Sequence, residues 1–580
     1  MTGEKNLRFA GALIDTLAAG GARGFVLSPG SRCTPLTVAA ASHPDIKIWR
    51  SIDERGAAFF AQGHAKAAGK PTVLVCTSGT AAANYLPGIV EASESGVPLV
   101  VLTADRPPEL RGCGAPQTTD QVKLYGDHVR FFQEAPVPDS LSDPEAAASA
   151  LALRALASAH SLRGPVHLNL PFREPFLPAS SKFAMASTAS RLWENAPSSV
   201  NAAQAEVLAD AIRKEERGWI VVGPLLRGEE LAPAIAALAE ASGYPILADA
   251  ASGLRFGAFP NVLSFADAWA RSEAAASELS PKLVLRFGAA PSSKQLGRMI
   301  TNSGARQIVF APDARWVDPD AKASDVFLGD PAGICLGTER LLRKKPLRRS
   351  YWMERHREID AAALEEIETV LGGQSVLGEI AAARTLIQSL PSGSNLFLSN
   401  SMPIRDVDWF SGMREEPLHV FVNRGANGID GILSSALGVA AATGRPTCLL
   451  TGDLALIHDA NALALAASNA LSLTVVLVNN SGGGIFHHLP IRKQAALFET
   501  YFQTPQNVDF QKLAAAFGAK SQPVESAEAL ARLLQEPAHG VRLLEIPVDP
   551  DLSAAQHRET WNRVQARLEN PKPLSKAVAR

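Results

Sequence analysis

The sequence contains few cysteines, and they are widely separated. The five cysteines lie at positions 33, 76, 113, 335 and 448 of a chain of 580 residues, so no pair has the spacing of a zinc site or of a redox Cys-x-x-Cys motif. Nothing in this pattern indicates a disulfide framework. We therefore expect a protein of the reducing cytoplasm.

The sequence also has no excess of charge of one sign. Its 56 lysines and arginines nearly balance 58 aspartates and glutamates, which is ordinary globular composition without a nucleic-acid-binding bias. One basic run, at residues 343–349, is followed closely by Glu354, Glu358 and Asp360. We interpret this region as a solvated linker with compensating charge, and we predict no nucleic-acid partner.

Long hydrophobic runs are missing as well. Residues 462–478 carry no charge, but they include Asn469 and Thr474 and many alanines, so a helix, a turn and a strand fit them better than a membrane span of about 20 apolar residues. The apolar stretch near the N-terminus is short and is broken by Asp15, unlike a secretory signal. We expect neither membrane insertion nor export.

Short apolar runs followed by turn residues and helix-like patterns recur along the chain. Examples are residues 72–76 (TVLVC), 219–222 (WIVV) and 447–451 (TCLLT). Near-continuous apolar strands that alternate with helices predict parallel sheets covered on both faces. The chain is too long for one core, so we predict an α/β fold class with three doubly wound parallel-sheet domains.

Two stretches of unusual composition divide the chain. Residues 177–200 are rich in Ser, Ala and Pro, and residues 340–375 combine the basic run with an acidic helix and end in GGQS. These joints predict an N-terminal domain at 1–180, a central domain at 200–345 and a C-terminal domain at 375–580.

One apolar run, in residues 475–486 (VVLVNNSGGGIF), ends in two amides and three glycines. In an open parallel sheet, ligands bind at the carboxyl ends of the strands, and Asp453 follows another strand one βα unit upstream. A carboxylate from Asp453, an amide oxygen from Asn480 and a carbonyl near Gly482 are hard donors that suit Mg²⁺ or Ca²⁺ rather than zinc. Glycines also let the backbone approach a diphosphate.

The same residues have a plainer interpretation as caps of turns and helices. The spacing favours the ion site, because Asn480 lies 27 residues after the Gly452–Asp453 pair. This arrangement is similar to the fingerprint of thiamine-diphosphate enzymes, although Leu454 stands where that fingerprint often has glycine.

A thiamine site also needs an acid that protonates the aminopyrimidine ring, so that its amine can deprotonate the thiazolium carbon. In thiamine enzymes this acid is a glutamate at the start of an N-terminal helix, and Glu54 follows the strand-like residues 48–52. Alone, Glu54 would be an ordinary acidic residue of a first helical turn. Paired with the downstream fingerprint, it is a candidate catalytic acid.

Further motifs make the resemblance specific. They span nearly the whole chain in order: SPGSRCTPL (28–36), DERGAAFFAQGHAKAAG (53–69), TSGTAAANYLP (77–87), TADRPPELRGCGAPQTTDQ (103–121), NSMPIRD (400–406), NRGANGIDG (423–431), GDLALIHD (452–459) and NNSGGGIF (479–486). Together they resemble the SEPHCHC synthases of menaquinone biosynthesis, in full the 2-succinyl-5-enolpyruvyl-6-hydroxy-3-cyclohexene-1-carboxylate synthases. Several of them separate this family from acetolactate synthases and simple 2-oxoacid decarboxylases.

The resemblance implies a transferase that uses thiamine diphosphate with Mg²⁺ or Mn²⁺. It implies decarboxylation of 2-oxoglutarate and addition of the succinyl carbanion equivalent to isochorismate, with release of CO₂. It further implies a homodimer or dimer of dimers, with the cofactor between the N-terminal domain of one subunit and the C-terminal domain of another. Glu54 and Asp453 would then meet across a subunit interface.

The matched motifs also imply roles for single residues. Ile429 would wedge between the two thiamine rings, and Ile485 and Phe486 would form an apolar wall. Polar residues matched to substrate orientation are Gln117, Asn400 and Ser401. Cations expected to bind the carboxylates of the two substrates are Arg32, Arg106, Lys294, Arg405 and Arg424.

Three other classes remain as rivals. An acetolactate-synthase-like ligase or a 2-oxoacid decarboxylase would act on smaller, less charged acceptors than this arginine set suggests. A nicotinamide dehydrogenase or a P-loop nucleotidase would need Gly-x-Gly-x-x-Gly or Gly-Lys-Ser/Thr motifs that are missing here. A cofactor-binding protein without chemistry would have no need of Glu54.

Overall fold

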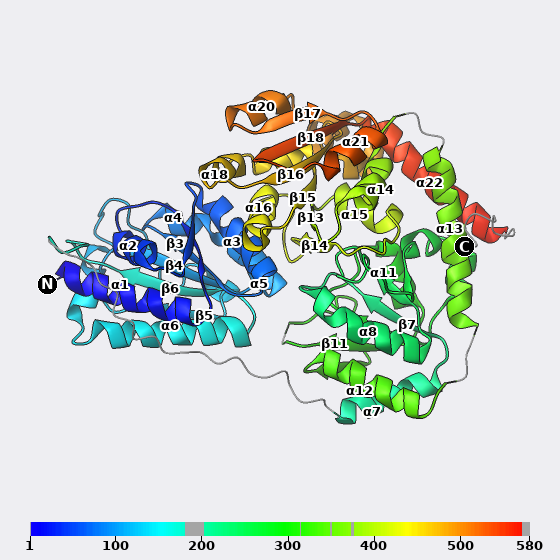
Figure 1. Cartoon of the computed structure of the whole chain (residues 1–580), viewed down its shortest axis with the longest axis horizontal. Helices are drawn as coiled ribbons and strands as arrows, with labels where there is room; N and C mark the ends of the chain where they lie inside the picture. Colours follow the sequence, from blue (N-terminus) through cyan, green and yellow to red (C-terminus); the bar gives the residue numbers. More distant parts are fainter. Residues whose placement is uncertain (1, 180–201, 314, 348–350, 373–375, 571–580) are drawn as a thin grey trace.

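Three open sheets organise the chain (Figure 1). The computed structural model describes residues 2–179, 202–313, 315–347, 351–372 and 376–570. Each sheet has six strands, all paired in parallel, with helices packed around it. The predicted α/β class with three parallel-sheet domains is confirmed, and the quoted runs form β3, β7 and β15.

The N-terminal sheet has the strand order β2-β1-β3-β4-β6-β5. Its strands are β1 (Gly24–Leu27), β2 (Lys47–Arg50), β3 (Thr72–Cys76), β4 (Leu99–Asp105), β5 (Phe131–Glu134) and β6 (Val166–Pro171). Its helices are α1 (Thr2–Ala19), α2 (Thr34–Ser42), α3 (Glu54–Ala68), α4 (Thr80–Asn84), α5 (Leu86–Ser95) and α6 (Pro144–Ser161).

The central sheet has the order β12-β11-β10-β7-β8-β9, which is the dinucleotide-fold order 6-5-4-1-2-3. Its strands are β7 (Gly218–Val222), β8 (Ile246–Ala248), β9 (Val262–Leu263), β10 (Leu283–Phe287), β11 (Arg306–Ala311) and β12 (Asp325–Leu328). The helices are α7 (Ala202–Lys214), α8 (Gly228–Ser242), α9 (Ala266–Trp269), α10 (Glu273–Glu278), α11 (Lys294–Asn302), α12 (Pro331–Lys344) and α13 (Trp352–Gly372).

The C-terminal sheet repeats the order of the N-terminal one, as β14-β13-β15-β16-β18-β17. Its strands are β13 (Asn395–Leu398), β14 (His419–Val422), β15 (Thr447–Gly452), β16 (Leu473–Asn479), β17 (Lys520–Pro523) and β18 (Val541–Pro547). Its helices are α14 (Glu379–Ser389), α15 (Met402–Phe410), α16 (Ile432–Thr443), α17 (Asp453–His458), α18 (Ala462–Ser468), α19 (Ala495–Phe498), α20 (Phe510–Ala516), α21 (Ala527–Gln535) and α22 (Pro550–Glu569).

The N-terminal and C-terminal domains share one apolar core, centred on the contact between α3 and α16 (Figure 1). The two helices approach closely because small residues face each other. A Cβ placed on Gly63 would lie 2.0 Å from the carbonyl oxygen of Ser435, and one on Gly438 would lie 2.1 Å from that of Phe60. The backbones themselves therefore form the contact.

The predicted joints differ in structure. The joint at 177–200 lies almost entirely outside the described residues, so the exact domain boundaries stay a prediction. The second joint contains α13, which packs against α22. The expectation that its charges are solvated is wrong for Asp360, which is buried and accepts hydrogen bonds from the backbone N–H groups of Ser264 and Phe265. Charge patterning alone does not reveal such buried partners.

The segment considered as a membrane span, residues 462–478, forms α18, a turn and most of β16, as predicted. Along the described residues, every helix is too short or too polar to serve as a membrane span.

Candidate active site

A cavity of about 410 Å³ opens at the carboxyl edge of the C-terminal sheet. The chain turns out of β13, β14, β15 and β16 at this edge, and each turn contributes side chains to the wall. The cavity brings together ten of the predicted site residues: Asn400, Ser401, Arg405, Arg424, Ile429, Asp453, Asn480, Gly482, Ile485 and Phe486.

Asp453 and Asn480 provide oxygen atoms at the base of this cavity. Asp453 is buried and accepts hydrogen bonds of 2.7 Å from the backbone N–H groups of Leu454 and Gly482. Burial raises the pKa of the Asp453 carboxyl to about 6, so its charge lacks compensation in the protein alone. A divalent cation would supply that compensation.

The amide of Asn480 has a fixed orientation. Its Nδ2 donates a 2.6 Å hydrogen bond to Glu379, while its Oδ1 is buried and has no hydrogen-bond partner among the described residues. A buried acceptor without a partner is costly unless a ligand satisfies it. A carboxylate, an amide oxygen and nearby backbone carbonyls form the donor set that hard cations prefer, so these residues fit the implied metal.

Glycine is required in the loop after β16. Gly482 has a φ of +126°, and a Cβ at this position would lie 2.0 Å from the carbonyl oxygen of Gln503. A Cβ on Gly484 would lie 2.2 Å from Nδ2 of Asn480. The bare backbone therefore allows the loop to pack against residues 502–503 beside the proposed metal ligands.

The change Gly482→Ala is expected to displace this loop, because it combines an unfavourable φ with a steric clash. We expect the affinity for Mg²⁺ and thiamine diphosphate to fall at least about tenfold, comparable to the loss of a supporting contact at a metal site. Isothermal titration calorimetry measures these affinities. Gly518→Ala is the control, since Gly518 also has positive φ but open space around it. Equal affinities of the two variants would contradict the prediction.

Asn400 connects the turns after β13 and β14. Its Nδ2 donates to the carbonyl oxygens of Asn423 and Asn427, at 2.8 and 3.0 Å, and its Oδ1 accepts a 3.2 Å hydrogen bond from Arg424. Asn400 is thus occupied in holding the wall of the cavity. Its amide orients Arg424.

Two guanidinium groups face the cavity. Burial lowers the pKa of Arg405, and the neighbouring charge of Arg424 lowers it further. Arg405 donates to the carbonyl oxygen of Ser401, and the Nε of Arg424 is buried without a partner among the described residues. Two adjacent cations with spare donors can hold a carboxylate of a ligand.

The remaining predicted wall residues are apolar. Ile429, Ile485 and Phe486 are all half-buried and line the same cavity as Asp453. Phe486 packs edge-on against Phe502, with 5.5 Å between the ring centroids. The cavity therefore has a polar end at Asp453 and Asn480 and an apolar wall beside it.

Glu379 and Asp406 also line this cavity, although neither was predicted from the sequence. Glu379 accepts hydrogen bonds of 2.6 Å from Asn480 and from Ser553 of α22. Asp406 is paired with His557 of α22 at 2.7 Å. These partners lie about 100 residues or more apart in sequence, so no spacing rule could have identified them.

We expect Glu379→Ala to release the Asn480 amide, because the carboxylate that fixes its orientation is lost. The expected result is an affinity for Mg²⁺ reduced about tenfold to a hundredfold, as is usual when the support of a metal ligand is removed. Titration of Mn²⁺ followed by electron paramagnetic resonance measures the change. The exposed Glu415 serves as control through Glu415→Ala, and unchanged Mn²⁺ affinity in Glu379→Ala would refute the role.

Four other predicted residues lie at the carboxyl edge of the N-terminal sheet. Glu54 is the first residue of α3, whose N-terminus is capped by Asp53, and it is half-buried. Arg32 is buried, donates to Phe172 and Glu174, and lies 4.7 Å from the ring centroid of Phe176. These residues do not line the 410 Å³ cavity of their own chain.

Arg106 and Gln117 complete the N-terminal set. Arg106 donates to the carbonyl oxygen of Pro116, and the Nε2 of Gln117 donates to that of Ser78 at 3.1 Å. Lys294 lies elsewhere, on a cavity of about 330 Å³ in the central domain. Within a single chain, the predicted site residues thus form two groups, one at the edge of each outer sheet, and Lys294 lies apart from both.

Comparisons with known proteins identify domains of thiamine pyrophosphate enzymes along the chain. Three family models match the chain: the N-terminal TPP binding domain of thiamine pyrophosphate enzymes at residues 7–124, the middle domain of thiamine pyrophosphate enzymes at 188–398, and their C-terminal TPP binding domain at 409–546. The first and third confirm the predicted thiamine-diphosphate-binding domains.

The chain is also similar to curated proteins over nearly its full length. It is 41% identical to the 2-succinyl-5-enolpyruvyl-6-hydroxy-3-cyclohexene-1-carboxylate synthase of Chloroflexus aurantiacus, over 97% of both chains. It is 41% identical to the protein of the same name from Myxococcus xanthus, over 97% of this chain and 98% of the relative. A third protein of the same name, from Geobacillus kaustophilus, is 41% identical over 96% of this chain and 97% of the relative.

Proposed function

The chain belongs to the SEPHCHC synthase family of thiamine-diphosphate enzymes, and we propose on this basis that it decarboxylates 2-oxoglutarate and adds the succinyl carbanion equivalent to isochorismate. The identity of 41% over 97% of the chain carries the proposal. The product would be 2-succinyl-5-enolpyruvyl-6-hydroxy-3-cyclohexene-1-carboxylate, an intermediate of menaquinone biosynthesis. Similarity across the full length to synthases of this one name argues against an acetolactate-synthase-like ligase or a simple decarboxylase.

Asp453, Asn480 and the backbone at Gly482 would hold Mg²⁺ or Mn²⁺ together with the diphosphate. The donor set, the raised pKa of Asp453 and the unpartnered Asn480 oxygen support this assignment. Thiamine diphosphate, when bound, supplies a carbon centre that accepts the electron pair released by decarboxylation. Ile429 would fix the bent shape of the cofactor, and Glu54 would hold a proton at its aminopyrimidine ring.

Cations of both half-sites would bind the two dicarboxylate substrates. Arg405 and Arg424 already share the cavity with Asp453, and burial in a site of low dielectric strengthens their interaction with a carboxylate. Arg32, Arg106 and Gln117 would join them from the N-terminal half-site. Asn400 and Ser401 would orient the substrates, while Lys294 stays a prediction, because it lies on another cavity.

We further propose a homodimer, or a dimer of dimers, in which a partner subunit supplies Glu54. The cavity is lined by residues of the C-terminal domain alone, and Glu54 of the same chain does not line it. A catalytic acid could then reach the cavity from a second copy. This arrangement would give two equivalent sites per dimer.

The activity is tested with purified protein, thiamine diphosphate and Mg²⁺, given 2-oxoglutarate with and without isochorismate. We expect CO₂ release coupled to formation of the succinyl adduct when isochorismate is present. Removal of the metal by a chelator should abolish turnover, and Mg²⁺ or Mn²⁺ should restore it. Efficient reaction with pyruvate, or no turnover despite tight cofactor binding, would overturn the proposal.

A further inference from the structure

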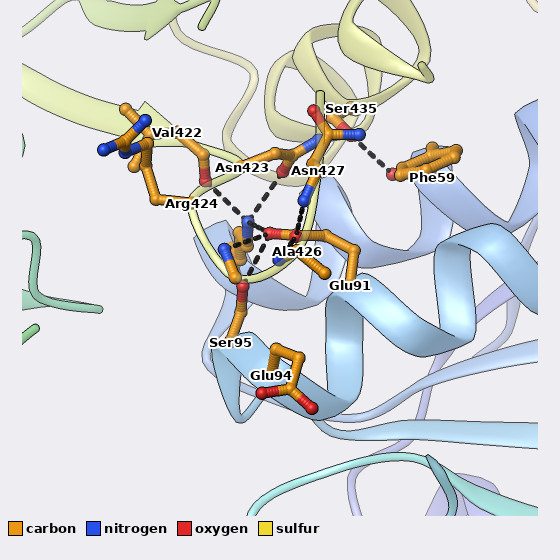
Figure 2. Close-up of polar contacts among 12 residues, drawn as sticks. Phe59, Glu91, Glu94, Ser95, Val422, Asn423, Arg424, Ala426, Asn427 and Ser435 are labelled. Carbon is orange, nitrogen blue, oxygen red and sulfur yellow. Dashed lines mark hydrogen bonds and ion pairs between the residues drawn. The ribbon is translucent and has the colours of Figure 1, made fainter. Parts of the chain in front are cut away.

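Glu91 is a buried carboxylate of the N-terminal domain that points into a loop of the C-terminal domain (Figure 2). It belongs to α5 and is 1% exposed. Its oxygens accept hydrogen bonds from the backbone N–H groups of Gly425, Ala426 and Asn427, at 3.0, 2.6 and 2.8 Å. Three consecutive N–H groups that converge on one anion form a strong local binding site.

Lys66 completes this contact from α3. Its Nζ lies 3.9 Å from Glu91, and it donates to the carbonyl oxygen of Val422 and to Oδ1 of Asn423, at 2.6 and 2.7 Å. Burial lowers the pKa of Lys66 to about 8, and the Glu91 charge opposes that shift. A buried pair of opposite charges that is this well hydrogen-bonded resists any change in the position of the loop.

The loop that these two residues hold is part of the cavity wall. Residues 423–431 connect β14 to α16 and include Arg424, Asn427 and Ile429, which all line the cavity. The backbone carbonyls of Asn423 and Asn427 also accept the hydrogen bonds that fix Asn400. Glu91 itself does not line the cavity. Its influence on the site must pass through the loop.

We propose that Glu91, together with Lys66, is a positioning residue of the active site, which holds the loop 423–431 so that Ile429 and Arg424 keep their places in the cavity. The identification of that cavity as the active site rests on the proposed function. The role of Glu91 in holding the loop does not depend on that function. Without the anion, the N–H groups of Gly425, Ala426 and Asn427 lose the acceptor that fixes them to α5, so the loop is held less tightly.

The central test is hydrogen exchange of the amides of residues 425–427 in Glu91→Gln, measured by mass spectrometry. Glutamine preserves the size of the side chain but removes the charge and offers one acceptor oxygen. We expect exchange at these amides to rise at least about tenfold, which corresponds to the loss of one charge-assisted hydrogen bond. Unchanged exchange would overturn the proposal.

Binding and kinetics separate a positioning role from a general contribution to stability. In Glu91→Gln we expect the Kd for thiamine diphosphate to rise, and kcat/KM to fall, by about tenfold to a hundredfold each. We expect Tm to change by only a few degrees. A lower Tm without faster exchange at 425–427 would show that Glu91 only joins the two domains. That result would also overturn the proposal.

Two controls are available in the chain. Glu94→Gln removes a charge from the exposed side of the same helix (Figure 2). Asn469→Ala removes hydrogen bonds to Arg50 that join the two domains away from the loop. Both should leave exchange at 425–427 and cofactor affinity unchanged. An effect of Asn469→Ala equal to that of Glu91→Gln would identify a loss of domain contact as the cause.

A second variant covers the case in which Glu91→Gln does not fold. Lys66→Met keeps most of the apolar stem and removes both hydrogen bonds to residues 422 and 423, and it should also speed exchange in the loop. If wild-type protein shows no synthase activity, the proposed function fails, but exchange and cofactor binding still decide the role of Glu91. If exchange is normal in both variants, the positioning role fails, whatever the activity.

Discussion

Glu54→Gln is expected to lower kcat by about 10²- to 10⁴-fold, the range for removal of a general acid or base, with little change in thiamine diphosphate affinity. Glutamine fills the same space at the start of α3, but its amide is not acidic enough to transfer a proton to a ring nitrogen. The binding residues Asp453 and Asn480 belong to the other half-site and are untouched. Steady-state kinetics combined with calorimetric cofactor binding measures both quantities.

The control for Glu54→Gln is Glu528→Gln. Glu528 is an exposed acidic residue in the first turn of α21, so its loss removes a comparable interaction with a helix terminus, worth about 0.3–1 kcal/mol. Its kcat should equal that of the wild type. A Glu54→Gln enzyme with normal kcat would show that Glu54 only stabilises its helix.

Asp453→Asn is expected to abolish productive cofactor binding. The change replaces the only charged ligand of the proposed metal site by a neutral amide, and we expect affinity for Mg²⁺ to fall at least about a hundredfold, beyond what loss of a supporting residue costs. Stability of the cofactor-free protein should not fall, because burial already disfavours the charge of Asp453. Mn²⁺ titration and thermal unfolding with and without Mg²⁺ provide the measurements.

Asp509→Asn is the matched control for this change. Asp509 caps α20 in an exposed position, and asparagine caps a helix as well as aspartate does. Wild-type Mn²⁺ affinity in Asp453→Asn would contradict the assignment of Asp453 as a ligand. A loss of Tm without Mg²⁺ would point to a structural role instead.

The two inactive variants together test the shared site. If one subunit supplies Glu54 and the other Asp453, a mixed dimer of Glu54→Gln and Asp453→Asn contains one intact site. Random exchange of subunits should then restore about a quarter of wild-type activity, since half of the dimers are mixed and each has one working site. No recovery after proven exchange would place both residues in the same chain.

Most central strands of this protein were predictable because they are short apolar runs buried on both faces, as in β3, β7 and β10. The edge strand β17 (KSQP) is polar and largely exposed, so no apolar run marks it. Apolar runs also located the C-terminal half-site, since Asp453 and Asn480 directly follow β15 and β16. Parallel strands bring their carboxyl ends to one edge, so the convergence of these residues followed from sequence order alone. Arg405, Arg424 and Ile429 were predicted as site residues from the family motifs that contain them, not from strand positions.

Supporting residues were not predictable in the same way. Glu91 and Glu379 lie in ordinary helical sequence, and their partners are 334 and 101 residues away along the chain. An acidic residue in a helix is usually solvated, and only the three-dimensional packing shows that these two are buried and satisfied. Asp360 was misjudged for the same reason.

The contact between α3 and α16 restricts how the enzyme can open. In a shear motion, packed helices slide past each other while the side chains between them change their packing. Here Gly63 and Gly438 leave backbone against backbone, so no layer of side chains lies between the helices at this point. We expect this close contact to disfavour relative shear of the two domains. We therefore expect reactants to enter and leave by displacement of loops or of the central domain rather than by sliding of the two outer domains.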